Sequence, residues 1–232
     1  MKRFRGHRVR AEHIQIGGRA YEVLVPLEGE ALLDEPRVIA RFDEDEYMPY
    51  WADLWPASLH LADALAAIGP VHAHGERPTL LELGCGLGLV GLVAADLGYA
   101  VTVSDYDEDA LAFAAESFRR NQLPAPEVRR IDWRRRYEGM AFDWIVGADV
   151  LYESRNVEPV ARFVRAHLRG GGRALISDPH RSTADSFAEV ARREGLEVSV
   201  VDRERDEARK RVRARVFDLQ RASGGDRAEG RS

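Results

Sequence analysis

The sequence predicts an α/β fold, with a mostly parallel sheet of seven strands, helices on both faces and one strand reversed. From Thr79 onward, short apolar runs alternate with helical segments. The run 142–147 is apolar almost throughout, as in a parallel strand buried on both faces. The last two runs are separated only by the charged stretch 202–211, so we expect them to pair as an antiparallel hairpin.

Residues 1–78 are expected to form an extension that packs on the core. Residues 13–25 are typical of a β-hairpin that turns at Gly17-Gly18. The stretch 26–50 is acidic and irregular. Pro56 suits the first turn of a helix, which we expect to run to Ile68 and to stop at Gly69-Pro70, before a loop to residue 78.

The core is expected to span residues 79–220, followed by a polar, glycine-rich tail, 221–232, that we expect to be disordered. A turn is expected at Gly170-Gly171-Gly172, and Ser182 or Thr183 is the expected N-cap of the last helix. The predicted helices are 89–97, 108–120, 157–168 and 182–193. The predicted strands are 79–83, 100–104, 127–131, 142–147, 173–177, 196–201 and 212–219.

Composition narrows the function classes. The 232 residues are 45% hydrophobic and 31% charged, which is ordinary for one soluble globular domain. The net charge is −5, so no nucleic-acid partner is expected. No apolar run approaches the ~20 residues that span a bilayer, and the basic N-terminus lacks the apolar stretch of a signal peptide. The single cysteine, Cys85, suits a reducing compartment, so we expect a cytoplasmic location.

A glycine-rich turn follows the first core strand, in the stretch Glu82-Leu83-Gly84-Cys85-Gly86-Leu87-Gly88. Glycines allow the backbone to approach a ligand without an intervening Cβ. Asp105 ends the second core strand, where a carboxylate can accept hydrogen bonds from both hydroxyls of a ribose. These features together predict a site for a nucleoside-containing cofactor.

Two cofactors compete for this turn. The stretch 86–91 fits the dinucleotide pattern G-x-G-x-x-G, with Asp105 near the usual distance. In the other register, Glu82 followed by G-x-G-x-G resembles motif I of the seven-strand S-adenosylmethionine (SAM) methyltransferases. We favour SAM because a carboxylate at Glu82 can reach the ammonium group of that cofactor, whereas it would repel a pyrophosphate. The reversed strand also suits the methyltransferase sheet better than the six-strand NAD domain.

Acidic residues also follow the third, fourth and fifth core strands, at Asp132, Asp149 and Asp178. Ligands of open α/β sheets bind at these strand ends. Asp132 can accept from the exocyclic amine of adenine while Trp133 packs on the ring, or Asp132 can simply cap a turn. The residues that we expect to bind the cofactor are Trp55, Glu82, Gly84, Cys85, Gly86, Gly88, Asp105, Tyr106, Asp132, Trp133 and Ala148.

Four motifs, in this order, resemble the family-16 group of seven-strand methyltransferases: WADLWP, ELGCGLG, DW and DVLY. The resemblance covers residues 51–179. Much of that group methylates protein lysines, and some bacterial members are labelled by similarity to nicotinamide N-methyltransferase. The resemblance implies that Asp149 and Tyr152, the D/E-x-x-Y positions after the fourth strand, are the catalytic residues beside the transferred methyl group.

Physical chemistry assigns roles to these residues independently. Methyl transfer from a sulfonium is an in-line displacement, which needs alignment more than acid–base chemistry. A lysine acceptor must first lose a proton, which costs roughly 4–5 kcal/mol at neutral pH from a pKa near 10.4. Asp149 can hold the ammonium and orient the amine, while Tyr152 walls the channel or donates a hydrogen bond. One of Trp51 and Trp55 is expected in the core, and Trp55 is the better candidate for a lid.

The expected function is therefore a SAM-dependent N-methyltransferase whose acceptor is a lysine side chain on a protein. One alternative is a small-molecule acceptor, either an amine or a pyridine-type ring. Another is a SAM-binding regulatory protein without turnover. An NAD oxidoreductase would need an acid or base at the hydride site, and none is evident. No metal site is expected, since His72 and His74 lack a third ligand. The sequence leaves the oligomeric state and the acceptor's identity open.

Overall fold

We describe the fold from a computed structural model that covers residues 2–27, 48–70, 75–207 and 210–222. Most of the acidic stretch 26–50, the pair His72 and His74, and the expected disordered tail from residue 223 lie outside these ranges. None of the described helices has the length and apolar character needed to cross a membrane.

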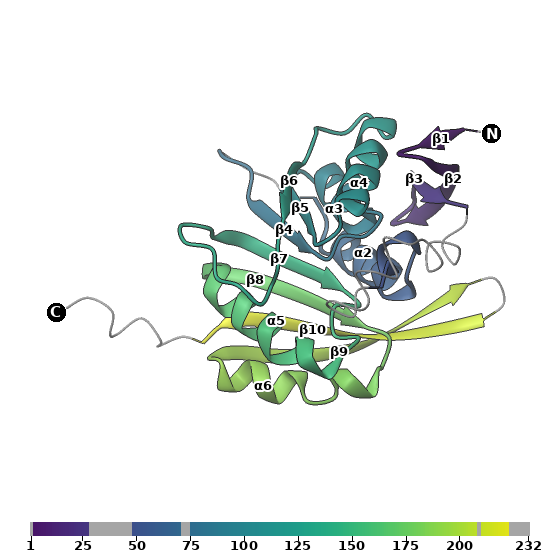
Figure 1. The fold of residues 1–232 in the computed structure, drawn as a ribbon. Helices are drawn as coiled ribbons and strands as arrows, with labels where there is room; N and C mark the ends of the chain where they lie inside the picture. Colours follow the sequence, from purple (N-terminus) through teal and green to yellow (C-terminus); the bar gives the residue numbers. More distant parts are fainter. Residues whose placement is uncertain (1, 28–47, 71–74, 208–209, 223–232) are drawn as a thin grey trace.

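A seven-stranded sheet forms the centre of the molecule, in the strand order β6-β5-β4-β7-β8-β10-β9 (Figure 1). Strands β4 to β8 pair in parallel, whereas β10 is antiparallel to both β8 and β9. The expected mixed sheet with one reversed strand is therefore confirmed. Its strands are β4 (Thr79–Leu83), β5 (Ala100–Asp105), β6 (Glu127–Arg130), β7 (Phe142–Ala148), β8 (Leu168–Asp178), β9 (Leu196–Glu207) and β10 (Lys210–Arg221).

Helices cover both faces of this sheet (Figure 1). One face carries α2 (Pro56–Ile68), α3 (Leu89–Asp96) and α4 (Glu108–Arg120), and the other carries α5 (Ser154–His167) and α6 (Phe187–Arg193). Side chains alternate between the two faces along each strand, so Leu80 packs in one hydrophobic cluster and Leu81 in the other. Pro56 is at the first turn of α2, as expected.

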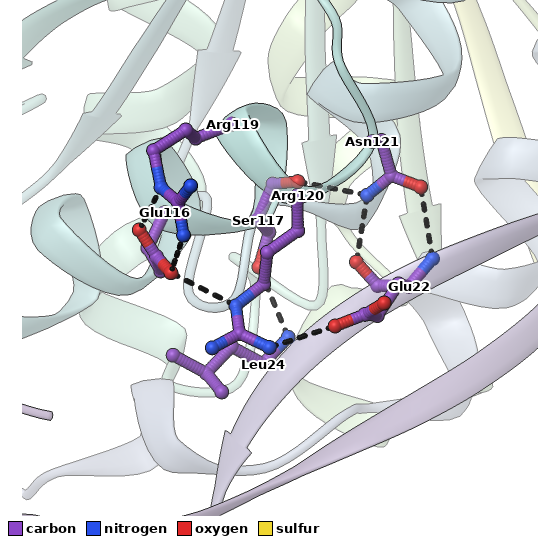
Figure 2. Close-up of polar contacts among 7 residues, drawn as sticks. All are labelled: Glu22, Leu24, Glu116, Ser117, Arg119, Arg120 and Asn121. Atoms are coloured by element: carbon purple, nitrogen blue, oxygen red, sulfur yellow. Dashed lines mark hydrogen bonds and ion pairs between the residues drawn. The ribbon is translucent and has the colours of Figure 1, made fainter. Parts of the chain in front are cut away.

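A second, three-stranded sheet is formed by β1 (Arg3–Phe4), β2 (His7–Ile16) and β3 (Arg19–Pro26). It confirms the predicted hairpin and adds β1, which was not predicted. Figure 2 shows how β3 is joined to α4. The Leu24 N–H donates to Ser117 Oγ (3.1 Å), and the Asn121 side chain bonds both the N–H (2.9 Å) and the C=O (2.7 Å) of Glu22. Side chains of α4 and of its C-cap residue, Asn121, thus take the place of a neighbouring strand.

The C-terminal hairpin is longer than the sequence predicted, because most of the charged stretch 202–211 is strand. In its register, Arg213 lies opposite Glu204, and Arg211 lies opposite Asp206. Arg213 Nε is 2.9 Å from Glu204 Oε1. Opposite charges on facing positions favour pairing of the two strands, so a run that resembles a loop forms a ladder instead.

Two local predictions around β8 and α6 are wrong. Gly170-Gly171-Gly172 lies inside β8, where the register with β7 shifts, rather than in a turn. A Cβ at Gly172 would come 2.7 Å from the carbonyl oxygen of Asp143, so glycine permits this close approach. Helix α6 begins only at Phe187, with Ser186 at the N-cap, because residues Ser182–Ala184 form a separate 3-10 turn.

Candidate active site

A cavity of about 350 Å³ opens at the carboxyl ends of β4, β5 and β7. Every residue predicted above to bind the cofactor lines it, as do both catalytic candidates, Asp149 and Tyr152. Parallel strands end at the same edge of a sheet, which explains why residues so far apart in sequence meet here. The structure therefore brings the predicted set together, while the role of each residue stays a prediction.

The glycine turn after β4 needs its glycines. Gly84, Gly86 and Gly88 have φ angles of 58°, 50° and 77°, in the left-handed region that side chains disfavour. A Cβ on Gly88 would lie 2.6 Å from the Cβ of Ala114 in α4. The turn is thus tightly packed on α4. Its Gly86 N–H donates to Asp105 Oδ2 (2.9 Å), which links the ends of β4 and β5.

Glu82 is buried beneath this turn, and its Oε2 accepts from the Gly91 N–H (2.9 Å) at the start of α3. A Cβ on Gly91 would come 2.6 Å from that oxygen, so this glycine makes room for Glu82. Burial raises the pKa of Glu82 to about 8, against the opposing effect of the Gly91 hydrogen bond. Burial likewise raises the pKa of Asp105 to about 6. At pH 7 Glu82 is therefore mostly protonated and can ionise when a positive charge arrives, whereas Asp105 is already mostly ionised.

Asp132 and Trp133 follow β6 on another wall of the cavity. Trp133 packs against the turn, since a Cβ on Gly84 would lie 3.4 Å from its ring. Burial alone would raise the pKa of Asp132, but hydrogen bonds from Arg134 outweigh it and hold the pKa below its usual range. Arg134 Nε and Nη2 lie 2.8 and 3.0 Å from the two carboxylate oxygens. Asp132 is therefore ionised, and both of its carboxylate oxygens already accept hydrogen bonds from Arg134.

Asp149, just after β7, has a left-handed backbone with φ 56°, and its N–H donates to the Ser177 carbonyl (2.8 Å). Its carboxylate accepts two hydrogen bonds from Arg181, at 2.6 and 2.8 Å. The resulting pair raises the pKa of Arg181. Tyr152 is half-buried, and burial raises its pKa to about 12, so its hydroxyl keeps its proton.

The two tryptophans of the WADLWP segment separate as expected. Both line the cavity, but Trp51 is buried and packs edge-on against His7 and tilted against Phe113, whereas Trp55 is only half-buried. Trp55 Nε1 donates to the Tyr50 carbonyl (2.7 Å). Trp51 is thus the tryptophan in the hydrophobic core, and the role of Trp55 as a lid stays a prediction.

Two residues near the end of β8, Asp178 and His180, lie off the cavity. Asp178, unlike the other strand-end acids, does not line the cavity; it is fully buried and accepts from the Arg181 N–H and from Arg215 Nε. His180 also lies off the cavity, 3.4 Å from Asp202. Cys85 does line the cavity, but burial raises the pKa of its thiol, which therefore stays protonated and is a poor nucleophile.

Among the cavity residues that sequence reasoning missed, Arg181 and Tyr50 have contacts with the predicted catalytic residues. The Tyr50 ring lies edge-on to both Trp55 and Tyr152, with centroids 6.1 and 5.3 Å away. Its place directly before Trp51 was the only signal for it. Arg181 could have been found because it follows the fifth core strand closely. It is a cation at the edge of the sheet where the other strands end in acidic residues.

Comparisons with known proteins agree with this geometry. Residues 37–191 match the family-16 methyltransferases, described as lysine methyltransferase. The chain is 38% identical over 106 residues to protein N-lysine methyltransferase METTL21A of Xenopus tropicalis, covering 44% of this chain and 47% of that protein. Against METTL21A of Danio rerio, the identity is 33% over 132 residues, covering 54% and 58%. The chain spans about half the length of the curated relatives it matches.

Among solved structures, magnesium protoporphyrin IX methyltransferase from Synechocystis, with bound SAH, superposes with a TM-score of 0.57 at 14% identity. The match covers 71% of this chain and 83% of that one, and it shows a shared methyltransferase fold. The family match itself extends over more than half of the chain. The protein belongs to the lysine methyltransferase family.

Proposed function

We propose that this protein is a SAM-dependent N-methyltransferase that methylates a lysine side chain of another protein. One observation carries the proposal: the glycine turn after β4, Asp105 after β5, and Asp149 with Tyr152 after β7 line a single cavity. A cofactor bound by the first two features would therefore lie beside the last two. Membership of the lysine methyltransferase family and the names of the METTL21A relatives support the same assignment.

The residues present fit SAM. Asp105 keeps lone pairs for a ribose diol beyond its bonds to the Gly86 and Asp107 N–H groups. Glu82 supplies a carboxyl group for the ammonium of the methionine part, and Trp133 offers a ring face to adenine. SAM itself would supply a methyl group activated by positively charged sulfur.

At the acceptor end, this chain's residues orient the nucleophile and exclude water. The rings of Tyr50, Trp55 and Tyr152 meet edge to face at the cavity, and such faces attract an ammonium group. Tyr152 keeps its proton because its pKa is raised to about 12, so it acts as a hydrogen-bond donor rather than as a base. We place the enzyme in the cytoplasm, where the buried free thiol of Cys85 remains reduced.

Incubation with tritiated SAM and a cell lysate tests the function. We expect label in proteins, lost when lysines are blocked by acetylation beforehand, and lost with Asp105→Ala enzyme. Label confined to low-mass compounds would make the small-molecule alternative correct. No transfer at all, with SAM still bound, would leave a regulatory SAM-binding protein.

A further inference from the structure

Asp149, the carboxylate expected to receive the acceptor's ammonium, is already paired with Arg181. Arg181 Nε is 2.6 Å from Asp149 Oδ1, and Arg181 Nη2 is 2.8 Å from Oδ2. This is a bidentate pair, the strongest common geometry between a guanidinium and a carboxylate. The Asp149 side chain is only 5% exposed. A second cation therefore has little access to Asp149 while Arg181 is in place.

The guanidinium also lies within the aromatic group at the cavity. Its central carbon is 5.8 Å from the ring centroid of Trp55. Tyr50 contacts the rings of both Trp55 and Tyr152. A carboxylate flanked by aromatic faces is the environment that an alkylammonium requires. Arg181 thus has the surroundings that a lysine acceptor would need.

Only the side chain of Arg181 is free to leave. Its backbone N–H donates to Asp178 Oδ1 (2.9 Å), and its carbonyl accepts from Arg215 Nη2 (2.7 Å). Arg215 also donates to Asp178, which is fully buried, so the backbone at Arg181 is tied to the end of the sheet. The Arg181 side chain, in contrast, is 35% exposed and can swing outward by rotation of its own bonds.

We propose that Arg181 holds the place of the acceptor's cation, and that a lysine ammonium binds by displacing the guanidinium from Asp149 into solvent. This inference rests on the proposed function and specifies its substrate class. An ammonium gives Asp149 a new partner, whereas a neutral acceptor would leave a buried carboxylate unpaired, which is strongly unfavourable. The exchange therefore selects cationic acceptors and disfavours neutral ones such as a pyridine-type ring.

The test uses n-butylammonium as a probe for the lysine side chain and 1-butanol as its neutral counterpart. Binding to the protein saturated with S-adenosylhomocysteine (SAH) is measured by NMR titration, without turnover. Arg181→Met removes the competing cation, so we expect n-butylammonium to bind about tenfold tighter or better than to wild type. Binding of 1-butanol should not change. Adding Asp149→Asn to Arg181→Met should abolish the gain, and Arg181→Lys, which keeps a cation, should show a smaller gain.

Arg173 provides a matched control. It makes a bidentate pair with Asp218, at 2.8 and 2.5 Å, and lies 5.5 Å from the ring centroid of Trp144, but it does not line the cavity. Arg173→Met should therefore bind n-butylammonium as wild type does. SAH affinity, measured for every variant, establishes that the cofactor site is intact.

Unchanged or weaker n-butylammonium binding to Arg181→Met and Arg181→Lys would overturn the exchange. An equal gain for 1-butanol would also overturn it, because the variant would then have opened space rather than freed a charge. Since the probe binds without methyl transfer, these results are separate from the lysate assay. Absence of labelled protein in that assay would refute the proposed function even if the probe bound as expected.

Discussion

Binding of SAM should release close to one proton at pH 7, chiefly from Glu82. Burial raises the pKa of this carboxyl to about 8, so about 90% of ligand-free molecules carry the proton at pH 7. An ammonium placed beside the carboxyl favours its ionised form. Glu82 is thus expected to release about 0.9 proton per molecule, and Asp105, with a pKa of about 6, about 0.1 more.

Calorimetry in two buffers of different ionisation enthalpy measures this release. Glu82→Gln keeps an acceptor for the Gly91 N–H but cannot ionise, so the release should fall to about 0.1, the share of Asp105. SAM affinity of the wild type should rise with pH up to about 8, whereas that of the variant should level off above about pH 6, where Asp105 is ionised. If the wild type releases no proton, or the variant releases as many, Glu82 does not ionise on binding and only supports the turn.

The raised pKa of Glu82 also makes the stability of the folded protein depend on pH. The folded protein holds the Glu82 proton more tightly than the unfolded chain, so this stabilisation is complete below pH 4.5 and is lost as pH rises through about 8. A rise in pKa from 4.5 to about 8 corresponds to about 5 kcal/mol. Urea unfolding of the ligand-free protein between pH 5 and 8 should show this loss in the wild type. In Glu82→Gln, only the smaller loss due to Asp105 should remain, and it should end near pH 6.

Three further substitutions separate the parts of the site. Asp105→Ala should weaken SAM binding by about 100-fold or more, since two charge-assisted hydrogen bonds are lost; calorimetry showing unchanged affinity would contradict the ribose role. Asp149→Ala should reduce turnover, measured by kinetics, by about 100-fold and leave SAM affinity, measured by calorimetry, nearly unchanged. A parallel fall in turnover and affinity would mean that Asp149 binds the cofactor instead. Gly88→Ala should cost roughly 2–4 kcal/mol in denaturant unfolding, because φ is 77° and its Cβ would contact Ala114; wild-type stability would show that the turn can shift.

Much of the fold could be predicted because its signals are local. The strand Thr79–Leu83 and the helix Glu108–Arg120 match their expected bounds, since each depends on a periodic apolar pattern and flanking residues. The cavity was predictable for a different reason. Once the strands are taken as parallel, the topology alone places Glu82, Asp105 and Asp149 at one edge.

What could not be predicted depends on contacts between distant segments. Arg181 and Asp149 are 32 positions apart, and nothing local to either indicates that they pair. The length of the C-terminal hairpin depends on charges such as Arg213 and Glu204 facing one another, which only the register reveals. The late start of α6 follows from the 3-10 turn before it, whose Thr183 hydroxyl donates to the Leu151 carbonyl.

The contact between β3 and α4 has a consequence for how this protein behaves among other chains. An exposed strand edge is a template on which a foreign strand can add and start aggregation. At Glu22 and Leu24, that edge is occupied by the side chains of Asn121 and Ser117. Helix α4 and its capping residue thus cover this edge of β3, and no further strand can pair with β3 there while the helix stays folded.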